Sequence, residues 1–225
     1  MTARVAIAVG SFGVAIFAWA VLGRVFPYVV RRAFREEGGR TGGMTLHEAL
    51  NKRRSQKAFL DRKLTPGQIA QLCWSAQGIT EREKGLRTAP SAQTLYSIGV
   101  YVVNSDGLFE YLPRPHSLRR VRSGDVLADL RGAASNQPSV GTAPFCLLLA
   151  MNLGPLQEKT GPRAERYASM EAGHIAQNVL LEATALGLAG IPVAGFDEEK
   201  VAAVVKLAPG LRPLYLLPVG YAVSK

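Results

Sequence analysis

The chain has 225 residues, 48% of them apolar, with 23 glycines and two cysteines, a composition that excludes a collagen-like, a disordered and a disulfide-stapled protein. Its net charge of +10 is spread along the chain, since residues 1–43 hold six Lys/Arg against two Asp/Glu and the remainder holds 21 against 15. Because the basic residues form no stripe with interleaved aromatics and no helix-turn-helix pattern is visible, we expect no nucleic-acid partner.

A hydrophobic segment of nineteen residues without a charge lies at Val5–Gly23. As a helix it would span about 28 Å, close to the hydrocarbon thickness of a bilayer. Arg4 precedes it, whereas four arginines follow it: Arg24, Arg31, Arg32 and Arg35. Since positive residues stay in the cytoplasm, we expect a single-pass anchor in the bacterial inner (cytoplasmic) membrane, with the following domain on the cytoplasmic side. Residues 1–35 then form the anchor and its basic flank, and residues 36–44 a glycine-rich linker.

Two alternative roles of this segment remain open. Residues 18–20 (AWA) resemble a signal-peptidase site, which would make the segment a cleaved export signal. The weak charge before the segment and the strong cluster after it favour the retained anchor. A buried core helix is disfavoured by the missing polar face and by three glycines: Gly10, Gly13 and Gly23.

Residues 45–225 predict one domain of mixed helices and strands. Thr45 caps a helix over LHEALNKRR, and Thr65-Pro66 opens a helix that ends before Gly78. The runs SIGVYVVN and GLFEYLP, on either side of Asp106-Gly107, are typical of a hairpin. Further elements follow in chain order: an amphipathic helix at 124–134, a strand buried on both faces at 143–152, the longest helix at 163–188, a helix at 197–206 capped by Asp197, and a closing strand at 213–223. Without strict βαβ alternation, this pattern indicates an α+β fold.

Several common site motifs are missing from the sequence. It has no GxGxxG after a strand, no GxxxxGK(S/T) loop and no GxSxG elbow. His47, His116 and His174 are scattered, and a single E-x-x-H at Glu171 falls short of a di-iron site, so we expect no metal. The two cysteines, Cys73 and Cys146, each lie inside an apolar run, as buried thiols do.

Four other segments carry chemistry. Residues 53–59 (RRSQKAF) gather two guanidiniums, a hydroxyl and an ammonium just after a helix, a cluster that can bind phosphate although charge runs are more often solvated helix ends. Residues 87–92 (RTAPSA) place small and hydroxyl-bearing side chains before a strand, where a planar ring can approach the backbone. The long helix carries R-x-x-R-Y and E-A-G-H-x-x-Q-N within residues 163–178. Residues 187–196 (GLAGIPVAGF) form a loop whose amides can donate to a ligand.

Together these segments resemble the nitroreductase superfamily and, within it, the SagB-type dehydrogenase branch. The branch patterns R-R-S-x-R/K-x-F and R/T-x-P-S-A are matched by residues 53–59 and 87–92, and the helix and loop patterns by residues 163–178 and 187–196. Any one pattern is unspecific, but all four occur in order within residues 45–222. The resemblance implies a mostly antiparallel central sheet flanked by helices, in an intertwined homodimer whose two chains build each of two FMN sites.

The resemblance also assigns a role to particular residues. Arg53 and Ser55 would hold the FMN phosphate, and Arg54 between them is also expected to bind the cofactor. Lys57 would lie near N1 and the C2 carbonyl of the ring, where a cation stabilises the negative charge of the reduced flavin. The other contacts would be made by Pro90, Ser91, Ala92 and Thr94 of the opposing chain, and by Pro192, Val193, Ala194 and Gly195 on the other side of the ring. Relatives often differ at three positions: Thr94, Ser97 and Ala194.

Lys159 and His174 are the candidates for catalysis. Azoline oxidases of the SagB branch use a Lys-Tyr pair as base, and the corresponding pair here is Lys159-Thr160. Glu171, His174 and Asn178 have the spacing i, i+3, i+7 and share one helix face. We expect them to satisfy one another or the partner chain.

These residues predict a membrane-anchored, FMN-dependent oxidoreductase that takes electrons from NAD(P)H and reduces a small electron-poor substrate such as a quinone or a nitroaromatic. One alternative is an azoline dehydrogenase of the SagB type that acts on modified peptides. Another is a non-catalytic flavin-binding subunit of a larger membrane complex.

Overall fold

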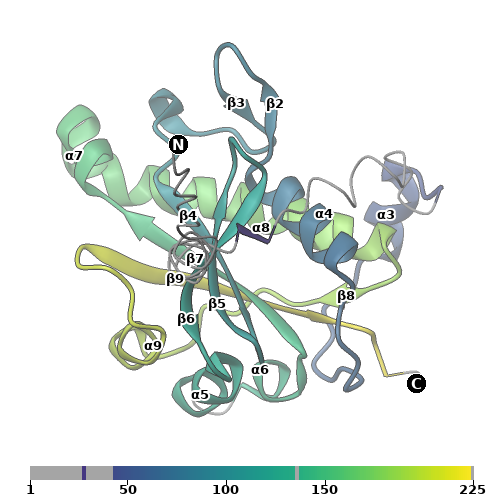
Figure 1. Cartoon of the computed structure of the whole chain (residues 1–225). Helices are drawn as coiled ribbons and strands as arrows, with labels where there is room; N and C mark the ends of the chain where they lie inside the picture. The colour runs from purple at the N-terminus through teal and green to yellow at the C-terminus, as the bar shows by residue number, and fades with distance from the viewer. Residues whose placement is uncertain (1–26, 29–42, 135–136, 224–225) are drawn as a thin grey trace, which may run out of the picture.

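Seven strands form one sheet in the order β1-β6-β5-β4-β7-β9-β8, and every neighbouring pair is antiparallel (Figure 1). The computed structural model describes residues 27–28, 43–134 and 137–223. In sheet order the strands are β1 (Pro27–Tyr28), β6 (Ser117–Ser123), β5 (Gly107–Leu112), β4 (Ile98–Asn104), β7 (Phe145–Asn152), β9 (Leu211–Gly220) and β8 (Ala189–Gly190). A separate hairpin consists of β2 (Ile79–Glu81) and β3 (Leu86–Arg87).

The buried strand β7 divides the core into two halves. Its residues from Phe145 to Met151 are all buried, as the continuous apolar run predicted. Because side chains alternate along a strand, Leu147 and Leu149 join one core cluster, whereas Cys146 and Leu148 join the other. The sheet therefore has an apolar layer on each face, and both faces need helices to cover them.

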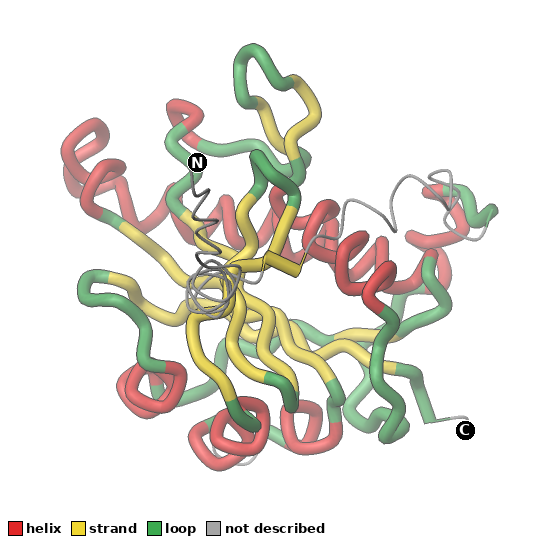
Figure 2. The backbone as a smooth tube through the Cα atoms, in the orientation of Figure 1, coloured by secondary structure: helices red, strands yellow, loops and turns green. Residues whose placement is uncertain are grey.

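Helices cover both faces of the sheet (Figures 1 and 2). The long helix α8 (Ala164–Ala185) lies on one side with α3 (Leu46–Lys52), α4 (Pro66–Gln77) and α7 (Gly154–Thr160). The other side carries α5 (Val126–Ala133), α6 (Pro138–Thr142) and α9 (Glu198–Val205). This architecture confirms the predicted α+β fold with an antiparallel sheet flanked by helices.

The helix starts follow the capping signals of the sequence. Thr45 and Thr65 each form a capping box, with Glu48 and Gln68 respectively, and Asp197 accepts from the Lys200 amide at the start of α9. At the end of α4, a Cβ on Gly78 would lie 2.3 Å from the Trp74 ring, so the chain needs glycine where it leaves this helix.

Some elements were not predicted. Strand β6 carries Arg119, Arg120 and Arg122, and it forms because it pairs with β5 along its length. The hairpin of β2 and β3 and the helices α6 and α7 were also missed.

The predicted membrane span and most of the linker lie outside the described residues. Among the residues that are described, no helix is long and apolar enough to cross a bilayer. Pro27–Tyr28, which fall in the predicted basic flank, pair as β1 with Leu118 and Arg119 of β6.

Candidate functional site

The basic segment lies directly after α3, as predicted, but its three cations have different surroundings. The Arg54 guanidinium turns back and donates to the carbonyls of Asn51 at 2.9 Å and Arg53 at 2.7 Å. Arg54 therefore closes the end of α3. Arg53 is half-buried and Lys57 exposed, and within the described part of the chain neither side chain has a hydrogen-bond or ion-pair partner. These two cations remain available to an anionic ligand.

Three segments distant in the sequence meet at this cluster. The backbone of Ser55 forms a parallel bridge with Gly190, and the Gln56 amide donates to the Gly190 carbonyl at 3.4 Å. Thr142 at the end of α6 donates to the Lys57 carbonyl at 3.5 Å. The predicted phosphate segment and the loop after Gly187 are thus brought together.

The loop 192–195 offers backbone donors. Val193 is held by both of its backbone hydrogen bonds to Leu216, at 2.8 and 2.9 Å, and the Gly195 carbonyl accepts from Gln137 Nε2 at 2.8 Å. Ala194 and Gly195 are exposed, and among the described residues their amides have no acceptor. A rigid strand bridge therefore presents two amides that can donate to a ligand.

The segment with Pro90, Ser91, Ala92 and Thr94 lies elsewhere. It runs through the short 3₁₀ helix η1 (Ala92–Thr94) before β4, at the upper left of Figure 1, whereas the loop after α3 lies at the right. Pro90 and Thr94 are exposed. One chain therefore carries both predicted halves of a flavin site but does not bring them together.

Glu171 on α8 is a buried carboxylate, 2% exposed, that holds this second segment. Its Oε2 accepts from Ser91 Oγ at 2.7 Å and from Ser97 Oγ at 3.1 Å. Backbone donors come from the amides of Ser97 and Ile98, each at 3.3 Å. A fifth donor is Gln77 Nε2 at 3.1 Å. The expectation of a structural role for Glu171 fits these contacts.

Glu171, His174 and Asn178 lie on one side of α8 but differ in burial. Three residues advance a helix by about 300°, about 60° short of a full turn, so His174 lies at the edge of the buried face and is exposed. Asn178 stays half-buried and donates to the Thr88 carbonyl at 3.2 Å. The three side chains do not satisfy one another.

The other catalytic candidate, Lys159, is exposed on α7. Burial raises the pKa of the Cys146 thiol to about 12 and also raises that of Cys73. Neither thiol ionises near neutral pH, so neither is a nucleophile. Among the described residues no group of His, Cys, Asp and Glu could hold a metal ion.

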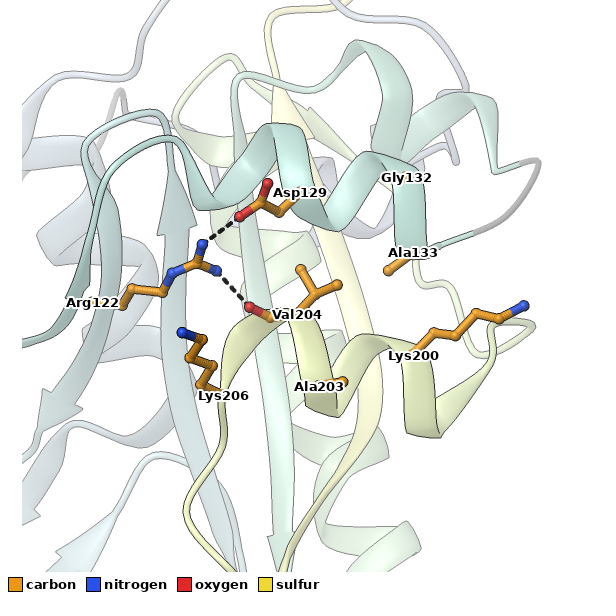
Figure 3. Close-up of a pocket in the computed structure, with 8 residues that line it drawn as sticks. All are labelled: Arg122, Asp129, Gly132, Ala133, Lys200, Ala203, Val204 and Lys206. Carbon is orange, nitrogen blue, oxygen red and sulfur yellow. Dashed lines mark hydrogen bonds and ion pairs between the residues drawn. The ribbon is translucent and has the colours of Figure 1, made fainter.

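A cavity of about 490 Å³ lies between α5 and α9 and contains none of the predicted flavin residues. Figure 3 shows Arg122 reaching between the two helices, where it donates to Asp129 and to the Val204 carbonyl, each at 2.5 Å. Two lysines, Lys200 and Lys206, also line it. Because Arg122 already satisfies a helix end and a carboxylate, we assign it to the packing of α9 against α5.

Comparison with known proteins decides the family. A family model described as the nitroreductase family matches residues 50–221. A protein of Methanocaldococcus jannaschii described as a nitroreductase is 35% identical over 185 residues, 80% of this chain and 92% of that protein. The chain belongs to the nitroreductase family, a family of oxidoreductases.

Two solved structures extend the comparison. A Ralstonia eutropha protein of the same description is 32% identical, with a TM-score of 0.76 over 83% of this chain and 87% of that one. A chain of the Escherichia coli microcin synthetase complex shares the fold at 22% identity and a TM-score of 0.68, over 94% and 92% of the two chains.

In this nitroreductase-family chain, the hydrogen-bond donors around Ser55 suit FMN. The flavin ring of FMN carries hydrogen-bond acceptors, and its side chain ends in an anionic phosphate. Arg53 can bind the phosphate, Lys57 can face the ring carbonyl, and the Ala194 and Gly195 amides can donate to ring acceptors. A Cβ at Gly190 would lie 2.9 Å from Leu180 Cδ2 and 3.3 Å from the Pro218 carbonyl oxygen, so a larger residue there would require the Leu180 side chain to shift.

Sequence reasoning missed two groups of residues at the site. Gln137, which fixes the Gly195 carbonyl, carries no motif. Gln77 and Ser97 hold Glu171, and only Ser97 carried a signal, as a position shortly after the RTAPSA segment where relatives often differ.

Proposed function

We propose that the protein is a homodimeric FMN-dependent oxidoreductase. The observation that carries this proposal is that the Ser55–Gly190 bridge joins the segment of Arg53 and Lys57 to the loop that exposes the amides of Ala194 and Gly195. Among the described residues, neither cation has a side-chain partner and neither amide has an acceptor. Membership of the nitroreductase family supports it independently.

A dimer would explain how the separated halves become one site. The segment Pro90–Ala92 lies apart from the basic cluster of its own chain, and the corresponding segment of a second copy would complete that cluster. The layer of α3 and α8 also exposes large apolar side chains, with Leu46 67%, Leu50 51% and Met170 47% exposed. Exposed apolar side chains on neighbouring helices favour association with another chain.

Each residue has a distinct task in this proposal. FMN supplies the two-electron chemistry when it is bound. Arg53 binds the phosphate bidentately, and Lys57 favours the negative charge that reduction adds near N1 and the C2 carbonyl. The amides of Ala194 and Gly195 orient the ring, and the partner's Pro90–Ala92 segment excludes water from its other side.

The finer function follows from the sequence. NAD(P)H is the proposed donor, and a quinone or nitroaromatic the proposed acceptor. We further infer a retained anchor that keeps the domain at the cytoplasmic side of the inner membrane, where lipid-soluble quinones are available. The four motifs favour the SagB branch, but Thr160 stands in place of the tyrosine in its Lys-Tyr base, so azoline oxidation is the second candidate.

One series of measurements tests the proposal. The purified full chain should be yellow, contain one FMN per protomer and lose its flavin absorbance anaerobically on addition of NAD(P)H. Quinones, nitroaromatics and azoline peptides should then be compared as oxidants. A colourless protein that does not take up added FMN would disprove the flavin site. Colour without bleaching would instead favour a flavin-binding subunit or another donor.

A further inference from the structure

A closed ring of contacts surrounds the buried carboxylate of Glu171. Ser91 donates to Glu171 and accepts from the Tyr96 amide at 2.8 Å. The Tyr96 hydroxyl accepts from the Arg87 amide at 3.1 Å, and the Arg87 guanidinium lies 4.1 Å from the centre of the Tyr96 ring. Arg87 then donates to Gln77 Oε1 at 3.3 Å, and Gln77 donates to Glu171. The ring joins α4, α8 and the segment before β4.

The backbone enclosed by this ring is strained. Gln93 and Thr94 each have φ of 54°, and Tyr96 has φ of 50°, in the left-handed region that favours glycine. Such a conformation costs about 1–2 kcal/mol per residue, and a β-branched threonine adopts it rarely. Three such residues within four positions need to be held from outside, and the Ser91 hydroxyl does so by linking the turn to Glu171.

A structural need alone does not account for a carboxylate here. A buried charge is expensive to desolvate, and buried ionic groups can often be replaced by apolar residues without loss of stability. Glu171 instead accepts five hydrogen bonds, and four of their donors belong to the segment 91–98. Strain that is held by a dedicated network is typical of segments that contact a ligand.

We propose that Glu171 is a positioning residue for the flavin site, which acts through Ser91 to fix the backbone of Pro90–Ala92 in the conformation that meets the ring. This inference rests on the proposed function, in which that segment contacts the FMN bound mainly by the partner chain. Arg87 and Gln77 belong to the same network, since Arg87 contacts Tyr96 and Gln77 donates to Oε1 of Glu171.

The test uses full-length Glu171→Gln, Ser91→Ala and the double variant, with Glu182→Gln as the matched control. Glu182 lies on the same helix and is half-buried, but none of its hydrogen bonds among the described residues reaches the segment 91–98. Two quantities are measured: FMN affinity, and amide hydrogen exchange of residues 91–97 in the flavin-free protein.

Each single variant should bind FMN about tenfold more weakly, because both changes remove the charge-assisted hydrogen bond from Ser91 to Glu171. Each should also exchange the amides of 91–97 faster, and Glu182→Gln should change neither quantity. Because Ser91 acts with Glu171, the double variant should lose no more affinity than the worse single variant. Additive losses, or slow exchange at 91–97 in both single variants, would overturn the proposal.

Two further outcomes also have a defined meaning: a Glu171 variant that does not fold, and a wild-type protein that binds no FMN. If Glu171→Gln does not fold, unchanged exchange and affinity in Ser91→Ala overturn the proposal, and faster exchange with weaker binding supports it. If the wild-type protein binds no FMN, the proposed function fails, while the exchange measurement still decides whether Glu171 holds the segment.

Discussion

Ser55 forms a parallel backbone bridge with Gly190, although most of the sequence of the domain lies between these two residues. At Gly190 the backbone approaches Leu180 and Pro218 closely. The bridge joins the segment that contains Arg53 and Lys57 to the loop that contains the amides of Ala194 and Gly195. In the proposed FMN site each cation would meet a different part of the ligand, so their roles can be tested separately.

Arg53→Gln should weaken FMN binding by about 1.5–3 kcal/mol, roughly ten- to a hundredfold, because a bidentate charge-assisted contact to the phosphate is lost. The phosphate is remote from the redox chemistry, so the midpoint potential of bound flavin should change little. Affinity is measured by fluorescence titration and the potential by anaerobic reductive titration. Lys200→Gln, which removes the same charge from the other side of the sheet, should leave both unchanged. An Arg53 variant with wild-type affinity would contradict the phosphate assignment.

Lys57→Gln should instead lower the midpoint potential of the flavin, because the attraction between Lys57 and the ring grows only when reduction adds negative charge. Coulomb's law at ~4 Å with an effective dielectric constant of about 20 gives ~4 kcal/mol as a ceiling, which solvent reduces. The affinity for oxidised FMN should fall less than in Arg53→Gln. If both variants lose affinity alike and neither shifts the potential, Lys57 binds phosphate and not the ring.

Met170→Lys should dissociate the proposed dimer and release FMN, since a charge on the outer face of α8 would be buried against the second copy. The mass of the detergent-solubilised protein, measured by light scattering, should fall from two protomers to one. Val121→Lys is the matched control, because Val121 is 45% and Met170 47% exposed but Val121 lies on β6. A wild-type protein that is a flavin-loaded monomer would exclude a site shared between chains.

Local signals predicted much of the fold. The caps Thr45, Thr65 and Asp197 marked real helix starts, and the apolar run 143–152 became the buried strand β7. Strand β6 escaped prediction because consecutive arginines break the alternation, and its pairing with β5 includes a register shift at Leu108/Phe109. Tertiary pairing, not the sequence of β6 itself, determines this strand.

The segments of the site were predicted separately, but the contacts between them were not, because these contacts also depend on tertiary structure. The segments 53–59 and 187–196 are recognisable because their residue types repeat a family pattern. The contact between Ser91 and Glu171 joins residues 80 positions apart, and that between Gln77 and Glu171 joins residues 94 apart. No local pattern encodes such a pairing, and helical spacing alone did not show that His174 is exposed.

The N-terminal segment provides the last prediction. If Val5–Gly23 is a retained anchor, the arginines after it should hold the domain in the cytoplasm. Alkaline phosphatase becomes active only after export, whereas green fluorescent protein becomes fluorescent in the cytoplasm. In a bacterial host, alkaline phosphatase fused after Lys225 should therefore be inactive and the fluorescent protein bright, and both should sediment with membranes. Replacing Arg24, Arg31, Arg32 and Arg35 by neutral residues should weaken this orientation, whereas replacing Arg4 should not. An active phosphatase fusion, or a mature N-terminus near Val21, would show that the segment is an export signal.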